Sequence, residues 1–473
     1  MSGLFRRKSI EIEHKGTQLA RTLSWPHLVA LGVGAIVGTG ILTLIGVGAD
    51  RAGPAVILSF AIAGAICACA ALAYAEMATM MPVSGSAYTY SYVVLGEVIA
   101  WVVGWSLLAE YTLVVAAVAV GWSGYVVGFL TGLGITLPDA LTHGPVMANG
   151  AVVSWGVNVP ALFIVAVVAG LLTLGTKESA TINAGLVIVK LIALVVFVAV
   201  ALPSFDGANF EPFSPFGLTK QVSADGVERG VMAAAAIIFF AFYGFDAIST
   251  AAEEAKNPGR DLAIGIVGSM VVCVAIYMVV ALAAIGALPF TRFADSPEPL
   301  ALILREVGQG GAATFLAASA VVALPTVILA FLYGQSRIFF VMARDGLLPA
   351  RLATVSSRGV PVRITLFTAA VVMVFAGFLP IDEIAALANA GTLTAFAAVG
   401  ICLLVMRRRA PDMARPFRTP AVWVVGLGAI GGCAYLFWSL PVRTQTWFLV
   451  WNVVGLVAYL AGYAVRRQGN SPT

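Results

Sequence analysis

The sequence predicts an all-α polytopic membrane protein with twelve spans and with both termini in the cytoplasm. Of its 473 residues, 60% are hydrophobic and 11% are charged, whereas charged residues make up about 25% of an average soluble domain. The mean hydropathy is +0.98, and apolar runs of about 20 residues, long enough to cross a bilayer, recur along the whole chain. These observations exclude a soluble enzyme, a disordered chain and a nucleic-acid-binding protein.

Each apolar run is expected to be a helix, because lipid cannot hydrogen-bond the backbone groups that an open strand would expose. The alternating segments of about ten residues that are typical of membrane β-barrels are absent from the sequence. Charged residues, proline and glycine separate the runs. Their approximate limits are 27–49, 55–78, 97–128, 159–175, 182–202, 230–252, 262–288, 312–343, 362–379, 383–406, 421–440 and 446–465.

Positive charge predicts the orientation. With the N-terminus inside, 20 of the 27 lysines and arginines fall in cytoplasmic stretches, 6 fall outside and one, Lys190, falls within a span. Because cytoplasmic loops carry an excess of these residues, residues 1–24 are predicted to be a cytoplasmic segment and 466–473 a cytoplasmic tail. Residues 1–24 are polar and do not resemble a signal peptide.

The first and sixth spans carry signs of interrupted helices. The first contains GVGAIVGTGI at 32–41, and its Gly-Thr-Gly sequence favours unwinding because each glycine costs about 1 kcal/mol in a helix interior. The sixth contains FFAFYGFD at 239–246. Interrupted helices at matching positions of two halves indicate an inverted-repeat transporter with a site at the membrane midplane. Alternatively, the G-x-x-x-G spacing of Gly34 and Gly38 only lets helices pack closely.

This reading divides the chain into two repeats of five spans. The first repeat covers 25–203 and the second 230–406, and the last two spans occupy 421–465.

The sequence contains no Ser-His-Asp set, no metal-binding cluster and no phosphate-binding G-x-x-x-x-G-K motif. We therefore expect no enzymatic activity, no cofactor and no metal ion.

Four ionisable residues lie within the predicted spans, where charge is costly and so marks candidate functional residues. Glu76 is close to the cytoplasmic end of the second span, where it can reach water or loops, and a structural role is favoured. Glu110 is expected to be interfacial or paired with a neighbouring helix. Asp246 follows the break in the sixth span, where it could cap free N–H groups or contact a substrate.

Lys190 is the strongest of the four candidates. It lies in the middle of the fifth span, in GLVIVKLIA at 185–193, too deep to extend easily to the membrane surface. Burial disfavours the charged form of an amine, so this lysine could gain and lose a proton during a functional cycle. The alternative is a lysine that is permanently paired with carbonyl groups or a carboxylate.

Four segments together resemble the amino acid–polyamine–organocation transporters, and among them the bacterial relatives of the cationic amino acid transporters. The resemblance covers about 25–465. The segments are GVGAIVGTGI at 32–41, PVSGSAYTY at 82–90, FFAFYGFDAISTAAEEAKNPGRD at 239–261 and YGQSRIFFVMARDGLLP at 333–349. The resemblance implies the LeuT-type fold, which has two inverted five-helix repeats and two extra helices.

The resemblance also implies a substrate site between the two interrupted helices. The carboxylate of an L-amino acid would meet the N–H groups of Gly38, Thr39 and Gly40. Its amino group would meet carbonyls near Ile36 and near three residues of the sixth span, namely Phe239, Phe240 and Ala241. The electrostatics of helix ends supports this arrangement, because the N-terminus of a half-helix attracts an anion and its C-terminus attracts a cation.

In this family a lysine in the fifth span can stand where sodium-coupled relatives bind sodium, and Lys190 matches that position. Proton coupling is therefore favoured over sodium coupling, although some relatives exchange substrates without net coupling. True cationic amino acid transporters have a small residue in the eighth span, where this chain has Phe331. Small or neutral substrates are therefore favoured, unless Phe331 faces lipid.

The predicted function is thus secondary active transport of L-amino acids, by proton symport and alternating access, in the cell membrane. The alternatives within the same class are an amino acid exchanger and a transporter of cationic amino acids or polyamines. A membrane amino acid sensor and a channel are alternatives of a different class. The expected partners are an L-amino acid, a proton and the lipid bilayer, and the sequence leaves open whether a small accessory membrane helix binds the chain.

Overall fold

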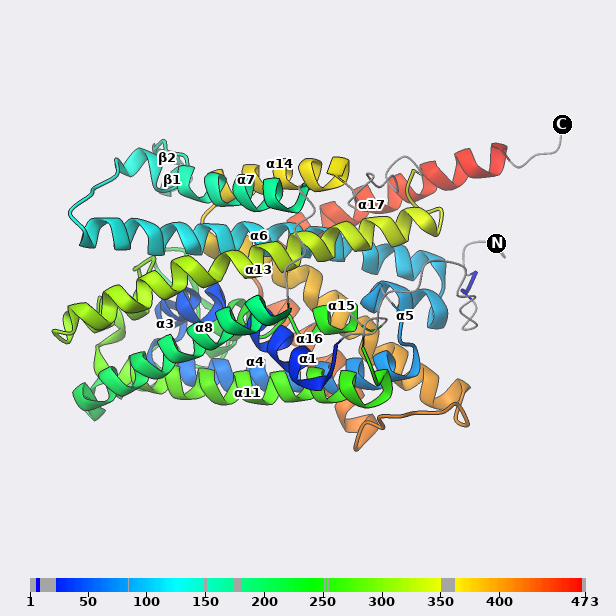
Figure 1. Cartoon of the computed structure of the whole chain (residues 1–473), viewed down its shortest axis with the longest axis horizontal. Helices are drawn as coiled ribbons and strands as arrows, with labels where there is room; N and C mark the ends of the chain where they lie inside the picture. Colours follow the sequence, from blue (N-terminus) through cyan, green and yellow to red (C-terminus); the bar gives the residue numbers. More distant parts are fainter. Residues whose placement is uncertain are drawn as a thin grey trace.

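The computed structural model describes residues 6–8, 23–83, 85–148, 151–173, 180–250, 252, 255–349 and 362–469. Most of the predicted N-terminal segment 1–24 and residues 470–473 of the predicted tail lie outside this part. Residues 6–8 and the end of the last helix, α17 (Val442–Gly469), lie at the same end of the molecule (Figure 1). This arrangement agrees with an even number of spans.

The described residues form a bundle of helices that run along one common direction (Figure 1). Ten stretches are long and apolar enough to cross a membrane, and two shorter apolar helices, α7 (Val159–Thr173) and α14 (Val362–Phe378), accompany them. These stretches follow the twelve predicted spans in order and confirm an all-α polytopic membrane protein. The other long helices are α4 (Val56–Met80), α6 (Glu97–Gly132), α8 (Ala180–Ala201), α11 (Pro258–Ala287), α13 (Gly310–Arg344), α15 (Ile381–Arg409) and α16 (Val422–Ser439).

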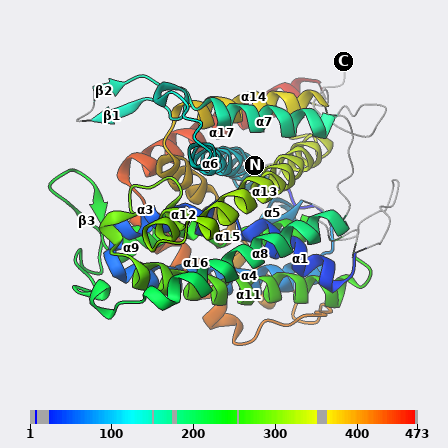
Figure 2. The ribbon, with the colours of Figure 1, turned by 60° about the vertical axis from the view of Figure 1, so that its left-hand side comes forward.

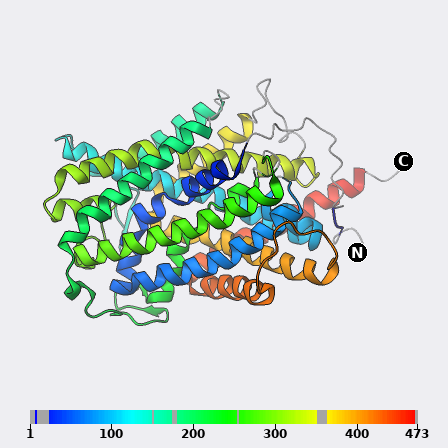
Figure 3. The same cartoon turned by 60° about the horizontal axis from the view of Figure 1, so that its bottom comes forward.

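Helix α6 lies at the centre of one side of the bundle. It packs against α13 and α15, and α7 and α14 pair with each other beside it (Figure 2). On the other side, α1 (Trp25–Ile36) packs against α11 and α8, which Figure 3 shows as a blue helix among green ones. Helix α4 also packs against α11. Helix α1 is the first half of the first interrupted span, which therefore forms part of this side.

Several short elements were not predicted. Helix α5 (Ser86–Val94) is fully buried, but its serines, threonine and tyrosines make it too short and too polar to appear as an apolar run. Helix α12 (Pro299–Glu306) lies in the connection before α13. Two small hairpins also occur in connections, formed by strands β1 (Val146–Ala148) and β2 (Ala151–Ser154), and by β3 (Gln221–Val222) and β4 (Glu228–Arg229).

Candidate functional site

The first span is interrupted, as the Gly-Thr-Gly sequence predicts. Helix α1 ends at Ile36, and a four-residue turn, α2 (Thr39–Leu42), and then α3 (Leu44–Ala52) continue the path. Gly38 between them has φ −156° and ψ −144°, so the backbone there is extended rather than helical. The last carbonyls of α1 and the first amides of α2 therefore lack their usual helical partners.

The sixth span is interrupted at the same level. Helix α9 (Val231–Ile238) passes into a 3₁₀ turn, η5 (Phe239–Ala241), and the chain resumes as α10 (Asp246–Thr250). Gly244 in the gap has φ +122°, and a side chain there would lie 2.9 Å from the Ala35 carbonyl carbon. Only glycine fits this position, because the backbone is left-handed and a second backbone approaches it closely.

A small cavity lies between the two breaks. Its volume is about 10 Å³, which is room for one water molecule. Six predicted site residues line it, namely Ile36, Gly38, Thr39, Gly40, Phe240 and Phe331. The other lining residues, which the sequence analysis missed, are Ala35, Val114, Val118, Tyr243 and Val327. Val114 and Val118 are four residues apart on α6, and Val327 and Phe331 are four apart on α13, so each pair shares one helix face.

Two predicted site residues do not line the cavity. Phe239 is fully buried against Phe396, with ring centroids 5.8 Å apart. Ala241 lies behind Gly40, where a side chain on the glycine would reach to 2.3 Å from the Ala241 Cα atom. The side chains of the 3₁₀ turn therefore point in different directions, and only that of Phe240 reaches the cavity. The prediction that carbonyls near Phe239, Phe240 and Ala241 meet the amino group of the substrate concerns main-chain atoms, and it stays a prediction.

The cavity is enclosed by buried residues, most of which have apolar side chains. Its lining side chains are buried, and Phe331, which is 2% exposed, packs against Tyr111 and Tyr243 with ring centroids 5.3 and 6.5 Å away. Phe331 therefore does not face lipid. Two buried hydroxyls, Thr39 Oγ1 and Tyr243 Oη, have no hydrogen-bond partner among the described residues. Both residues belong to the lining of the cavity.

An ion pair lies toward each end of the molecule. At the predicted cytoplasmic end, Lys8 Nζ lies 2.8 Å from Asp345 Oδ1, just after α13. At the opposite end, Arg51 Nη2 of α3 lies 3.1 Å from Asp382 Oδ2 in the first turn of α15. The helices must separate before a molecule larger than water can enter the cavity.

Lys190 lies apart from this cavity, in the middle of α8. Its side chain is 4% exposed, and Nζ donates to the Gly34 carbonyl at 3.0 Å and contacts Thr326 Oγ1 at 3.2 Å. The ammonium group thereby joins α8 to α1 and α13. A second cavity of about 10 Å³ borders Lys190 and is otherwise lined by apolar side chains and Ser319.

Asp246 and Glu110 occupy buried positions between α10 and α6. Asp246 accepts hydrogen bonds from the Gly244 N–H at 3.0 Å and from the Tyr111 hydroxyl at 3.2 Å. It caps the break and does not line the cavity. Glu110 is 0% exposed, and neither of its carboxylate oxygens accepts a hydrogen bond from the described residues. Glu110 thus lies inside the bundle beside α15, and its predicted role stays a prediction.

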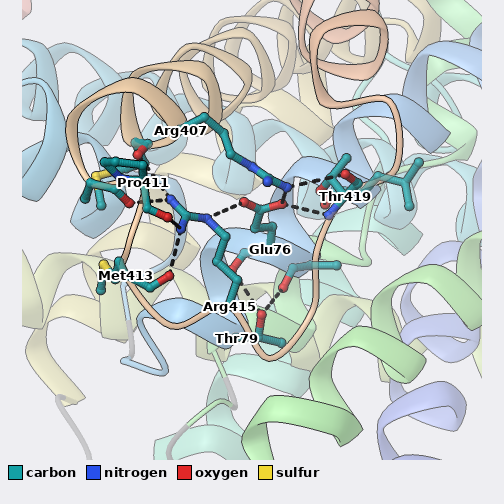
Figure 4. A network of polar contacts seen from close by, with 11 residues as sticks. Glu76, Thr79, Arg407, Pro411, Met413, Arg415 and Thr419 are labelled. Carbon is teal, nitrogen blue, oxygen red and sulfur yellow. Dashed lines mark hydrogen bonds and ion pairs between the residues drawn. The ribbon is translucent and has the colours of Figure 1, made fainter.

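Glu76 is the centre of a buried ionic network at the end of α4 (Figure 4). One carboxylate oxygen lies 2.7 Å from both Arg407 Nη2 and the Thr419 N–H, and the other lies 3.1 Å from Arg415 Nε. The carboxylate is 1% exposed and the side chain of Arg415 is 6% exposed. The network ties α4 to the connection between α15 and α16, which agrees with a structural role.

We expect Glu76→Gln to lower the thermal stability of the protein strongly. Removing one partner of a buried ion pair costs about 3–5 kcal/mol, because the remaining charges lose their compensation. Glu383→Gln is the matched control, since its partner Arg443 is 67% exposed and a surface pair contributes under about 1 kcal/mol. Thermal unfolding of both variants in detergent measures the difference. Equal melting temperatures would contradict a structural role for the network.

A membrane-spanning helical bundle with two interrupted helices around a central cavity defines a secondary transporter. The chain matches the sequence model of the amino acid permease family over residues 23–460, and it belongs to this family. Through the family it is a member of the amino acid–polyamine–organocation superfamily, whose fold is LeuT-type.

Three relatives illustrate the range of this similarity. The chain is 43% identical to the branched-chain amino acid permease BcaP of Bacillus subtilis, an alignment that covers 96% of this chain and 97% of that protein. It is 40% identical to the methylthioribose transporter of Bacillus subtilis, over 97% of each chain. It is 37% identical to the vacuolar cationic amino acid transporter 4 of Arabidopsis thaliana, over 87% of this chain and 68% of that protein. The chain is an amino acid transporter and a multi-pass membrane protein, not an enzyme.

Proposed function

We propose that the chain is a proton-coupled symporter of neutral L-amino acids, with branched-chain side chains fitting best, in the cell membrane. The observation that carries the proposal is the composition of the central cavity. None of its lining residues is acidic, so a guanidinium or ammonium side chain would have no counter-charge there. Phe331, Val327, Val114 and Val118 instead offer an apolar surface to the side chain of the substrate.

The main-chain groups at the two breaks would hold the zwitterionic part of the substrate. Amides at Gly38–Gly40 begin a half-helix and favour the carboxylate, whereas carbonyls at the ends of α1 and α9 favour the amino group. Thr39 and Tyr243 add two hydroxyls with no described partner. In this proposal residues 25–203 and 230–406 act as inverted repeats that move against each other in alternating access.

Proton coupling would reside at Lys190. Its ammonium group bridges three helices through Gly34 and Thr326, so loss of its proton would weaken the contact between α1, α8 and α13. Glu110 is a second candidate, because its carboxyl group is fully buried inside the bundle, where an ionisable group is costly and marks a candidate functional residue.

The proposal is tested with purified protein. A thermal-shift screen of the twenty amino acids, with methylthioribose and arginine included, identifies ligands. Uptake and counterflow of the best radiolabelled ligand into proteoliposomes then follow, with and without an inward proton gradient. We expect leucine, isoleucine or valine to stabilise the protein most and a proton gradient to raise uptake. Preferential binding of arginine or methylthioribose would refute the substrate class, and binding without counterflow would indicate a sensor.

Phe331→Ser is expected to widen the range of substrates. The shorter side chain opens the cavity between α6 and α13, so arginine and lysine should begin to compete for binding. Leucine should bind about tenfold more weakly, because apolar contact is lost at about 25 cal/mol per Å². Competition binding against radiolabelled leucine measures both effects. Phe315→Ser on the same helix is the control, since Phe315 is 42% exposed on the outer surface. An unchanged ligand profile in Phe331→Ser would remove this residue from the site.

A further inference from the structure

Side chains from uninterrupted helices hold the carbonyl ends of both interrupted helices. On α11, the Tyr277 hydroxyl donates to the Ile36 carbonyl at 2.7 Å. On α15, Asn389 Nδ2 donates to the Ala236 carbonyl at 2.7 Å and to the Ile237 carbonyl at 2.9 Å. Both side chains are 0% exposed. Each donor therefore holds carbonyl groups at or next to a break in a fixed direction.

The amide orientation of Asn389 follows from these contacts. Two carbonyl oxygens face the same end of the side chain, and only the NH₂ group can donate to both. The opposite atom, Oδ1, is buried and has no partner among the described residues. An unsatisfied buried acceptor costs free energy, so this position is not optimised for stability alone.

Aromatic contacts fix the position of the Tyr277 ring. It packs against Phe60 of α4, with ring centroids 6.1 Å apart, and against Phe242, 5.2 Å away, which follows η5. Tyr277 thus contacts one interrupted helix through its hydroxyl and the other through its ring. Rotation of either break would disturb both contacts.

The carbonyls that accept hydrogen bonds from Tyr277 and Asn389 lie close in sequence to residues that line the cavity. Ala35 precedes Ile36 and lines the cavity, and its carbonyl accepts from no side chain of the described residues. Phe240, shortly after Ile237, lines it from the other side. Because adjacent peptide planes share a Cα atom, holding one carbonyl restricts the direction of the next. Tyr277 therefore restricts the direction of the Ala35 carbonyl, and Asn389 restricts the path of the backbone into η5.

We infer that Tyr277 and Asn389 are positioning residues for the amino group of the substrate. They contact main-chain carbonyls and not the substrate, and they orient the neighbouring carbonyls toward the amine. The inference rests on the proposed function, because it requires an amino acid in the central cavity. A displacement of about 1 Å in such a group is enough to lose much of a polar interaction.

The test compares leucine with 4-methylpentanoate, which is leucine without its amino group. Tyr277→Phe removes one oxygen atom, and Asn389→Leu replaces the amide with an apolar group of similar size. Ser59→Ala is the matched control, because Ser59 of α4 donates at 2.8 Å to the Val231 carbonyl, at the opposite end of α9. Affinities come from competition binding in detergent, with thermal unfolding as the check on folding.

We expect each variant to bind leucine about five- to tenfold more weakly, while the affinity for 4-methylpentanoate stays unchanged. Ser59→Ala should change neither affinity. Equal weakening of both ligands, or no weakening of leucine, would overturn the inference. If Asn389→Leu does not fold, Tyr277→Phe decides the outcome alone. A wild-type protein that binds no amino acid would instead refute the proposed function, which separates the two failures.

Discussion

Replacing Gly40 with valine is expected to weaken substrate binding by about a hundredfold while the protein still folds. A Cβ atom at Gly40 would lie 2.3 Å from the Ala241 Cα atom and 2.6 Å from its Cβ atom. No rotation of a side chain relieves this overlap, because one of the opposing atoms belongs to the backbone of the second interrupted helix. The two breaks would be forced apart at the point where the proposed site needs both. Overpacking of this kind costs about 1–3 kcal/mol or more, so binding should fall by about a hundredfold.

Equilibrium binding of radiolabelled leucine to purified Gly40→Val measures this loss. Gly38→Ala is the graded comparison, since a Cβ atom there would lie 3.5 Å from Val327 Cγ2, an ordinary contact distance. We expect Gly38→Ala to retain measurable binding. Gly431→Ala on α16, where a side chain meets nothing within 4 Å, controls for expression and folding. Wild-type affinity in folded Gly40→Val would show that the close approach of the two helices is not required.

Replacing Lys190 with alanine is expected to abolish the stimulation of uptake by an inward proton gradient. The variant lacks the group proposed to bind the proton, together with its contacts to Gly34 and Thr326. Substrate affinity should be partly retained, because Lys190 does not line the central cavity. A proton can shift an equilibrium only by its differential affinity for the two states. A tenfold difference in that affinity supplies about 1.4 kcal/mol.

Reconstituted vesicles with and without a pH step provide the measurement. Lys220→Ala removes a lysine that donates to the Leu440 carbonyl outside the spans, so it controls for the loss of one positive charge. Counterflow should persist in Lys190→Ala, because exchange needs no net proton movement. Full proton-driven uptake by this variant, or a sodium requirement in the wild type, would contradict the mechanism. If Glu110→Gln loses the stimulation and Lys190→Ala keeps it, the carboxyl group is the coupling site.

The sequence alone predicted the spans and the two interrupted helices. Hydrophobicity over about 20 residues is a local property, and a bilayer allows only helices there. The Gly-Thr-Gly sequence at 38–40 likewise marks a local weakness in a helix. Lys190 could be found because an ammonium group in the middle of an apolar run is costly wherever the run packs. Its partners on α1 and α13 could not be identified in this way, because the sequence of one span does not indicate which other helices pack against it.

Only the tertiary structure decided which side chains meet. Glu76 and Arg407 are 331 residues apart in sequence, and nothing near either residue predicts their contact. Val114 and Val118 line the cavity, whereas Phe239 and Ala241 do not, although all four are apolar. The physical reason is that a helix in a membrane is apolar on every face, so the 3.6-residue period that reveals the buried side of a soluble helix is missing. Rotation and packing of neighbouring helices then determine which apolar side chain faces the cavity, which faces another helix and which faces lipid.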